Sequence, residues 1–98
     1  MRDDDATGVY AISVAAEMVS MQVQNLRVFE RRGLLDPTRT PGGTRRYSRA
    51  DIRRLVRIRD LLADGLNLAG IERVLHLEDE VARLAHENQR LRRGLPRR

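Results

Sequence analysis

The side chains of this protein that could do chemistry are mostly arginines. All 19 of its basic residues are arginine, and the chain has neither lysine nor cysteine. The guanidinium group is a planar fork that binds phosphate through two hydrogen bonds and can read the edge of guanine. Eleven arginines and only four acidic residues lie between Arg27 and Asp60. Such a concentration of positive charge predicts a polyanionic partner, with nucleic acid as the first candidate.

The residues that enzymes and metal centres need are absent or scattered. Without cysteine there are no disulfides, thiolate metal ligands or cysteine nucleophiles. The two histidines, His76 and His86, are ten residues apart and lack an accompanying carboxylate cluster, phosphate-binding glycine loop or nucleophile motif. We therefore expect no enzymatic activity, no catalytic residue, no metal and no cofactor.

Two short predicted helices precede and enter the basic stretch. Ser13 is a helix-start residue within the apolar segment 12–18, and Ser20 gives a second start signal shortly afterwards. Gly33 supplies the stop for the second helix. Two helices joined by so short a turn predict a helix-turn-helix unit.

The second of these helices has one apolar and one polar face. Helical spacing turns Val23, Leu26 and Phe29 inward. The outward positions carry amides and guanidiniums, the groups that read base edges and phosphates in a major groove: Gln22, Gln24, Asn25, Arg27, Arg31 and Arg32. This composition predicts a DNA-reading helix, with an ordinary solvated helical hairpin as the alternative.

A basic hairpin and a third helix follow. The segment 38–47 has Pro-Gly-Gly at its centre, which predicts a β-hairpin whose tip holds Arg39, Arg45 and Arg46. Next to a helix-turn-helix, such a hairpin would be a wing that lies along phosphates. Ser48 and Asp51 then form a capping-box variant that starts a helix running to about residues 64–65. Its expected inner face is formed by Ile52, Leu55, Val56, Arg59 and Leu62.

The C-terminal part follows a heptad pattern. Asn67 can cap a short helix over 68–75, and from Val74 seven residues recur at intervals of 3, 4, 3, 4, 3 and 4. This pattern predicts a coiled coil, and its terminal location favours self-association over packing against its own domain. The predicted dimerisation residues are Val74, Leu77, Val81, Leu84, Asn88, Leu91 and Leu95.

The charges of this helix favour an antiparallel homodimer. Residues 77–87 hold four acidic residues and one arginine, whereas residues 88–98 hold five arginines and no acid. An antiparallel pair sets the acidic part beside the basic part. Asn88 favours the opposite, because a lone Asn at such a position often pairs with its mate in parallel dimers. An antiparallel coil would hold two reading domains about 33 Å apart, close to one DNA turn, which predicts an inverted-repeat operator.

A chain of 98 residues can hold one small domain and an extended element. The predicted fold is mainly α, a winged helix-turn-helix followed by a coiled-coil helix. We divide the chain into a disordered acidic leader (1–9), a DNA-binding domain (10–73), the dimerisation helix (74–95) and a basic tail (96–98). No apolar run approaches the roughly 20 residues of a membrane span and no secretory signal is visible, so we expect a cytoplasmic, nucleoid-associated protein.

Several motifs, in their order and spacing, resemble the MerR family of winged-helix transcription regulators. They are LRVFERRGL at 26–34, RRYS at 45–48, Asp51-Ile52, and GLNL at 65–68. The likeness spans roughly residues 10–92. Within the family, segments 12–16, 42–48 and 67–71 are similar to HspR-like heat-shock repressors.

The resemblance implies roles for individual residues. Arg27 and Arg45 match arginines that contact DNA. Phe29 stands where the family usually has a backbone-contacting tyrosine, and Tyr47 matches an aromatic residue that approaches phosphate at the base of the wing. The family's coil is antiparallel, and HspR-like repressors use a DnaK-type chaperone as corepressor. Phe29 lacks the phenolic hydroxyl, and Val28 and Asn25 also depart from the commoner residues, so phosphate binding or base preference would differ.

The rival interpretation is a coiled-coil protein-interaction module with only non-specific nucleic-acid affinity. Such a module needs arginines but no outward amides, so Gln22, Gln24 and Asn25 favour the regulator. Sensing members of the family carry an effector domain or metal-binding cysteines beyond the coil. This chain has no cysteine, and we expect DNA binding without a small-molecule effector domain.

Overall fold

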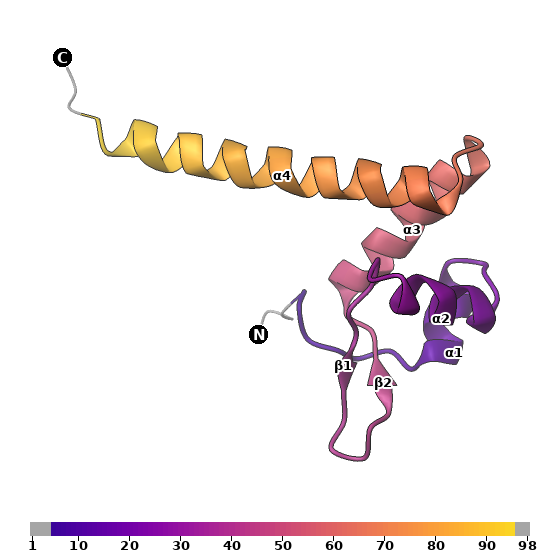
Figure 1. The fold of residues 1–98 in the computed structure, drawn as a ribbon. Coiled ribbons are helices and arrows are strands. Elements are labelled where there is room, and N and C mark those ends of the chain that lie inside the picture. Colours follow the sequence, from indigo (N-terminus) through magenta and orange to yellow (C-terminus); the bar gives the residue numbers. More distant parts are fainter. Residues whose placement is uncertain (1–4, 96–98) are drawn as a thin grey trace. The chain divides into compact units, whose positions relative to one another are not determined.

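The computed structural model describes residues 5–95 and shows four helices and one hairpin in them. In chain order these are α1 (Ile12–Met18), α2 (Val23–Arg31), β1 (Thr38–Arg39), β2 (Arg45–Arg46), α3 (Arg49–Ala63) and α4 (Leu68–Arg93) (Figure 1). The chain divides into two compact units, the first ending at Gly65 and the second beginning at Leu66. The prediction of a mainly helical fold with a small hairpin is confirmed.

The helix-turn-helix forms as predicted, but its start signals were assigned wrongly. The N-caps are Ala11 and Gln22, both with extended backbone, in place of Ser13 and Ser20. Ser13 lies inside the first turn of α1, and Ser20 occupies a left-handed conformation (φ 57°) in the turn, so neither can cap. Gly33 adopts φ 77° just after α2, a conformation that glycine tolerates without strain, and ends the helix as predicted.

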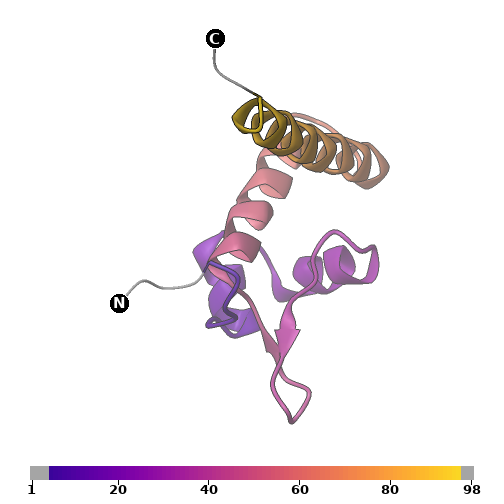
Figure 2. The same ribbon diagram turned by 90° about the vertical axis from the view of Figure 1, so that its left-hand side faces the viewer.

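The wing is a two-stranded antiparallel hairpin with Thr38 opposite Arg46 and Arg39 opposite Arg45. Its turn is closed by hydrogen bonds between Thr40 and Thr44 and between Gly43 and Thr40, each 2.8 Å. Within the first unit the hairpin protrudes from the helices (Figure 2). The predicted hairpin is confirmed, but its arginines lie on the strands and the tip holds only residues 40–44.

The segment before α1 packs against the wing. Tyr10 and Tyr47 form a β-bridge, with N–H···O distances of 2.9 and 2.7 Å. The Asp5 carbonyl accepts from the Ala50 amide at 3.1 Å, and at Gly8 a Cβ would lie 2.8 Å from the Arg46 carbonyl oxygen. The prediction of a disordered leader over 1–9 is therefore wrong for residues 5–9, because these backbone bonds hold them; residues 1–4 lie outside the described range.

Helix α3 begins with the predicted capping box. The Ser48 hydroxyl accepts from the Asp51 amide at 3.0 Å, and the Asp51 carboxylate accepts from the Ser48 amide at 2.9 Å. The buried stripe differs from the predicted one: Leu62 is exposed, and Ile58 takes a place in the core that the sequence pattern did not assign to it. The core of the first unit consists of Ala15, Ala16, Val19, Leu26, Phe29, Leu34, Leu35, Tyr47, Leu55, Ile58 and Leu61.

Helix α4 is continuous, so the short helix predicted over 68–75 is wrong in its end: it runs on without interruption into the predicted coil from Val74. Asn67 caps it as predicted, its side-chain oxygen accepting from the Gly70 amide at 2.8 Å. The helix ends at Arg93 with Gly94 as C-cap, so Leu95 lies beyond it. The predicted basic tail, 96–98, falls outside the described residues. None of the described helices is long and apolar enough to cross a membrane.

Candidate nucleic-acid interface

Helix α2 presents the polar face that the sequence predicts. Leu26 and Phe29 are buried on one side, and Val23 and Val28 are half-buried at its margins. The exposed polar residues on or directly beside this helix include Gln22, Gln24, Asn25, Arg27, Arg31 and Arg32. Gln22 is the N-cap and makes no side-chain capping bond. The amides and guanidiniums needed to read a groove are therefore presented together along this nine-residue helix and its caps.

The wing is joined to α2 by one carboxylate. Glu30 accepts from Arg39 Nη2 at 2.7 Å through Oε1 and from Arg45 Nε through Oε2. Arg39 Nη1 also donates to the Gly43 carbonyl at 3.1 Å, which links the same guanidinium to the turn of the hairpin. Sequence reasoning assigned no role to Glu30. The sequence did contain a signal for this role, because Glu30 is the only acidic residue of α2 and lies between a basic helix and a basic hairpin.

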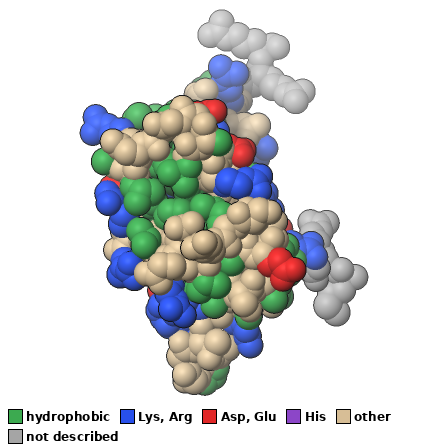
Figure 3. Space-filling view, turned by 90° about the vertical axis from the view of Figure 1, so that its right-hand side faces the viewer, with side chains coloured by type: hydrophobic (Ala, Val, Ile, Leu, Met, Phe, Trp, Pro, Cys, Tyr) green, Lys and Arg blue, Asp and Glu red, His purple; other side chains and the backbone are tan. Residues whose placement is uncertain are grey.

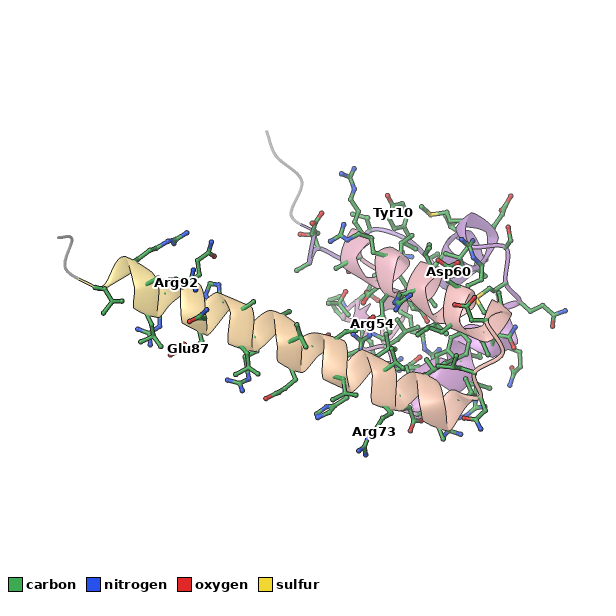
Figure 4. The ribbon with its side chains drawn as sticks, turned by 90° about the horizontal axis from the view of Figure 1, so that it is seen from above. Tyr10, Arg54, Asp60, Arg73, Glu87 and Arg92 are labelled. Atoms are coloured by element: carbon green, nitrogen blue, oxygen red, sulfur yellow. The ribbon has the colours of Figure 1, made fainter. Side chains whose placement is uncertain are left out.

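Two arginines of α3 donate hydrogen bonds to the backbone of the helix-turn-helix and the segment that follows it. Arg54 Nε donates to the Leu34 carbonyl at 2.8 Å, and Arg59 Nη1 donates to the Val19 carbonyl at 3.2 Å (Figure 4 labels Arg54). Val19 is the C-cap of α1, where a helix end leaves carbonyl acceptors unsatisfied, and Leu34 lies in the segment that follows α2. Part of the arginine content of this stretch therefore serves structure and is not available to a polyanion.

Two predicted DNA contacts lie inside the protein. Phe29 is 3% exposed and Tyr47 is 0% exposed. Phe29 faces inward because it shares the apolar side of α2 with Leu26, and Tyr47 is covered because the segment around Tyr10 pairs across it. A side chain with almost no accessible surface does not touch phosphate, so Phe29 and Tyr47 are not part of the interface. The exposed or half-buried wing residues that stay are Arg39, Arg45 and Arg46.

The Tyr47 hydroxyl is buried without a hydrogen-bond partner in the described part of the chain. Burial, reinforced by the negative charge of Glu30, raises the pKa of Tyr47 above its ordinary value of 10. The folded state therefore holds this proton more tightly than the unfolded state does. The resulting stability is fully present below pH 10 and is lost as the pH rises past the folded-state pKa.

We expect Tyr47→Phe to keep or raise stability by up to about 1 kcal/mol, because it removes a buried hydroxyl that has no partner. Unfolding followed by circular dichroism at pH 7 and in steps above pH 10 measures this, and the variant should lose less stability than the wild type in the alkaline range. DNA affinity should stay unchanged. A clear loss of affinity in Tyr47→Phe would instead restore the phosphate contact that the resemblance implies.

Helix α4 carries an uncovered apolar stripe. Leu77, Val81, Leu84 and Leu91 are between 52% and 65% exposed, and they recur at the predicted heptad spacing. Neighbouring charges pair along the helix, with Arg83 to Glu80 at 2.6 Å and Arg90 to Glu87 at 2.5 Å. The hydrogen bond from Arg83 lowers the pKa of Glu80. Glu87 and Arg92 project from different sides of the helix (Figure 4).

The described surface carries many arginine side chains. Arginine side chains are spread over the face that Figure 3 shows, with acidic side chains in fewer places. Among residues 5–95, no group of three or more His, Asp or Glu side chains could hold a metal ion. The candidate functional site of the described chain is therefore α2 together with the basic wing that Glu30 joins to it.

The arrangement of these elements matches a known family of regulators. Residues 10–78 fit the model of the MerR helix-turn-helix regulatory proteins. The chain belongs to the MerR family. The homologues that it matches are transcription regulators and not enzymes.

Individual members of the MerR family show how far the likeness extends. HspR of Streptomyces coelicolor, described as a heat shock protein, is 49% identical over 79 residues, which cover 80% of this chain and 52% of HspR. The chain thus spans about half the length of this relative. The N-terminal part of MtaN, the multidrug transporter activator of Bacillus subtilis, has a TM-score of 0.65 and 26% identity, with 88% and 91% of the two chains covered. HiNmlR, a family member lacking the sensor domain and bound to promoter DNA, shares the fold with a TM-score of 0.61 at 23% identity, with 87% of this chain and 76% of HiNmlR covered.

Proposed function

We propose that this protein is a sequence-selective DNA-binding transcription regulator of the HspR-like repressor type. The observation that carries the proposal is the exposed face of α2, on which Gln24, Asn25 and Arg27 stand beside a basic wing tethered through Glu30. Amide side chains at a helix surface read base edges, and guanidiniums bind phosphate or guanine. Membership of the MerR family and the likeness to HspR support this reading.

Selection from random duplex DNA tests the proposal. The purified chain is mixed with a pool of random duplexes at moderate salt, and bound DNA is amplified and sequenced over several rounds. We expect enrichment of an inverted repeat with half-sites about one helical turn apart. Salt-sensitive binding without any enriched sequence would contradict the proposal and favour the interaction module with non-specific affinity.

We further propose that α4 forms an antiparallel homodimer. The uncovered stripe at heptad spacing supports self-association, because an exposed apolar row of this length on one helix face is rare in a monomer. The division of charge along the helix supports the antiparallel direction, in spite of Asn88. Leu95 is not counted in the interface, since it lies beyond the helix end.

Cysteine pairing distinguishes the two directions. The chain has no cysteine of its own, so Leu77→Cys and Leu91→Cys each introduce a single thiol. Both positions are seven residues from Leu84. In an antiparallel coil centred on Leu84, residue 77 of one chain therefore lies beside residue 91 of the other chain. We expect a mixture of the two variants to form a mixed disulfide dimer on oxidation, whereas each variant alone should cross-link poorly. Efficient cross-linking of each variant with itself would contradict the antiparallel direction.

Two finer proposals rest on the HspR likeness and on the DNA-binding role. A DnaK-type chaperone acts as corepressor, and the protein works at the DNA of the nucleoid. Titration of a labelled operator with this protein, with and without purified DnaK, tests the first. Tighter binding in the presence of DnaK is expected, and an unchanged titration curve would contradict it.

A further inference from the structure

Glu30 is placed to do more than join two elements. Its carboxylate is 17% exposed and binds one arginine from each strand of the wing, Arg39 and Arg45, which face each other in the hairpin register. Both carboxylate oxygens are engaged, each by a different guanidinium. The inference below rests on the proposed function, because it concerns how the same surface selects DNA.

The wing needs such a tie because its own pairing is minimal. Each strand has two residues, and a two-stranded ribbon of this size is marginally stable in water. Arg39 extends the tie to the turn through the Gly43 carbonyl. The distance between the exposed face of α2 and the wing therefore depends on Glu30, since it supplies the side-chain ion pairs that reach from α2 to both strands.

The charge of Glu30 has a second consequence. Glu30 is an acid within a surface that would meet phosphates, and like charges repel most strongly where water is excluded. Its ion pairs also occupy the Nε of Arg45 and the Nη2 of Arg39. These two nitrogens are therefore engaged by the carboxylate, and only the other N–H groups of the two guanidiniums remain to face DNA. We propose that Glu30 is a positioning residue that makes binding selective. It fixes the position of the wing relative to α2 and lowers the affinity for DNA that cannot contact both elements at once.

The test compares Glu30→Gln with a matched charge control, Glu17→Gln. Glu17 is an exposed residue of α1, and its replacement removes the same charge without touching the wing. For Glu30→Gln we expect affinity for random duplex to rise about 3-fold and affinity for the selected operator to fall about 10-fold, so the operator-to-random ratio falls about 30-fold. Glu17→Gln should change both affinities alike and leave the ratio within about 2-fold. An equal ratio in the two variants would overturn the proposal.

A measurement without DNA separates failure of this inference from failure of the proposed function. In NMR spectra of the ¹⁵N-labelled full chain, the Arg45 Nε–H should exchange slowly with solvent in the wild type and Glu17→Gln, and rapidly in Glu30→Gln. Rapid exchange in the wild type would show that the tie is absent and would overturn the proposal, whatever DNA is selected.

A second variant guards against misfolding of Glu30→Gln. Arg39→Gln removes one of the two ion pairs and leaves the carboxylate in place, so it should lower the operator-to-random ratio by a smaller factor than Glu30→Gln. Circular dichroism reports whether each variant is folded. A folded Arg39→Gln with a wild-type ratio, together with slow Arg45 exchange, would also contradict the proposed role.

Discussion

Replacing Leu84 by aspartate should turn a dimer into a monomer at micromolar concentration and weaken operator binding by about 100-fold or more. Leu84 is the central member of the uncovered stripe on α4, and the variant would bury an unpaired charge in the seam of the coil. A monomer binds one half-site, and linking two binding sites typically gains a factor of about 10² to 10⁴ in affinity. Analytical ultracentrifugation and titration with the selected operator measure the two effects.

The control for this experiment lies two residues away. Ala82 is exposed and falls outside the heptad stripe, so Ala82→Asp adds the same charge on the outer face of the same helix. It should leave the dimer and the operator affinity close to those of the wild type. If Leu84→Asp stays dimeric, or if both variants dissociate equally, the interface does not run along this stripe.

Replacing Arg27 by alanine should weaken binding to operator and random duplexes alike, by about tenfold per half-site, and reduce the salt slope by about one unit per half-site. Arg27 is exposed on the polar face of α2, one turn before Glu30, and is placed to bind phosphate. Affinities measured across a series of salt concentrations give the slope. A loss confined to the operator would show that Arg27 reads a base.

Gln24→Ala provides the contrast on the same helix. Gln24 is exposed and uncharged, so its loss should not alter the salt slope. We expect it to relax base preference at one position of each half-site, by about 1–3 kcal/mol at that position. Repeating the selection from random duplexes with this variant shows the position. Equal losses on all duplexes for Gln24→Ala and Arg27→Ala would contradict the division between base-reading and phosphate-binding residues.

Local signals in the sequence predicted most of the elements correctly. The capping box at Ser48 and Asp51, the stop at Gly33 and the hairpin centred on Pro41-Gly42-Gly43 are confirmed, because each depends on residues only a few positions apart. The prediction that Ser13 and Ser20 are N-caps was wrong because it used residue type alone. Cap strength is a preference of residue type, whereas the packing of Ala15, Ala16 and Val19 decided where α1 begins and ends.

The candidate site could be predicted only in part. Helical periodicity identified the exposed face of α2, with Gln24, Asn25 and Arg27 outward. It could not show that Tyr47 lies inside, because an aromatic residue at the end of a strand is covered or exposed according to what pairs beside it. Here that neighbour is the segment around Tyr10, at the boundary that the sequence placed between a disordered leader (1–9) and the DNA-binding domain (10–73).

By itself, then, the sequence determined the order of the elements, the polar face of α2 and the uncovered heptad stripe of α4, since each follows from a period or a turn within one segment. The tertiary structure alone decided which charges meet: Glu30 with Arg45, 15 residues apart, and Asp5 with Arg53, 48 residues apart. Such pairs depend on how separate segments pack. A chain with 19 arginines and 14 acids offers far more possible ion pairs than it can form, and only the packing selects among them.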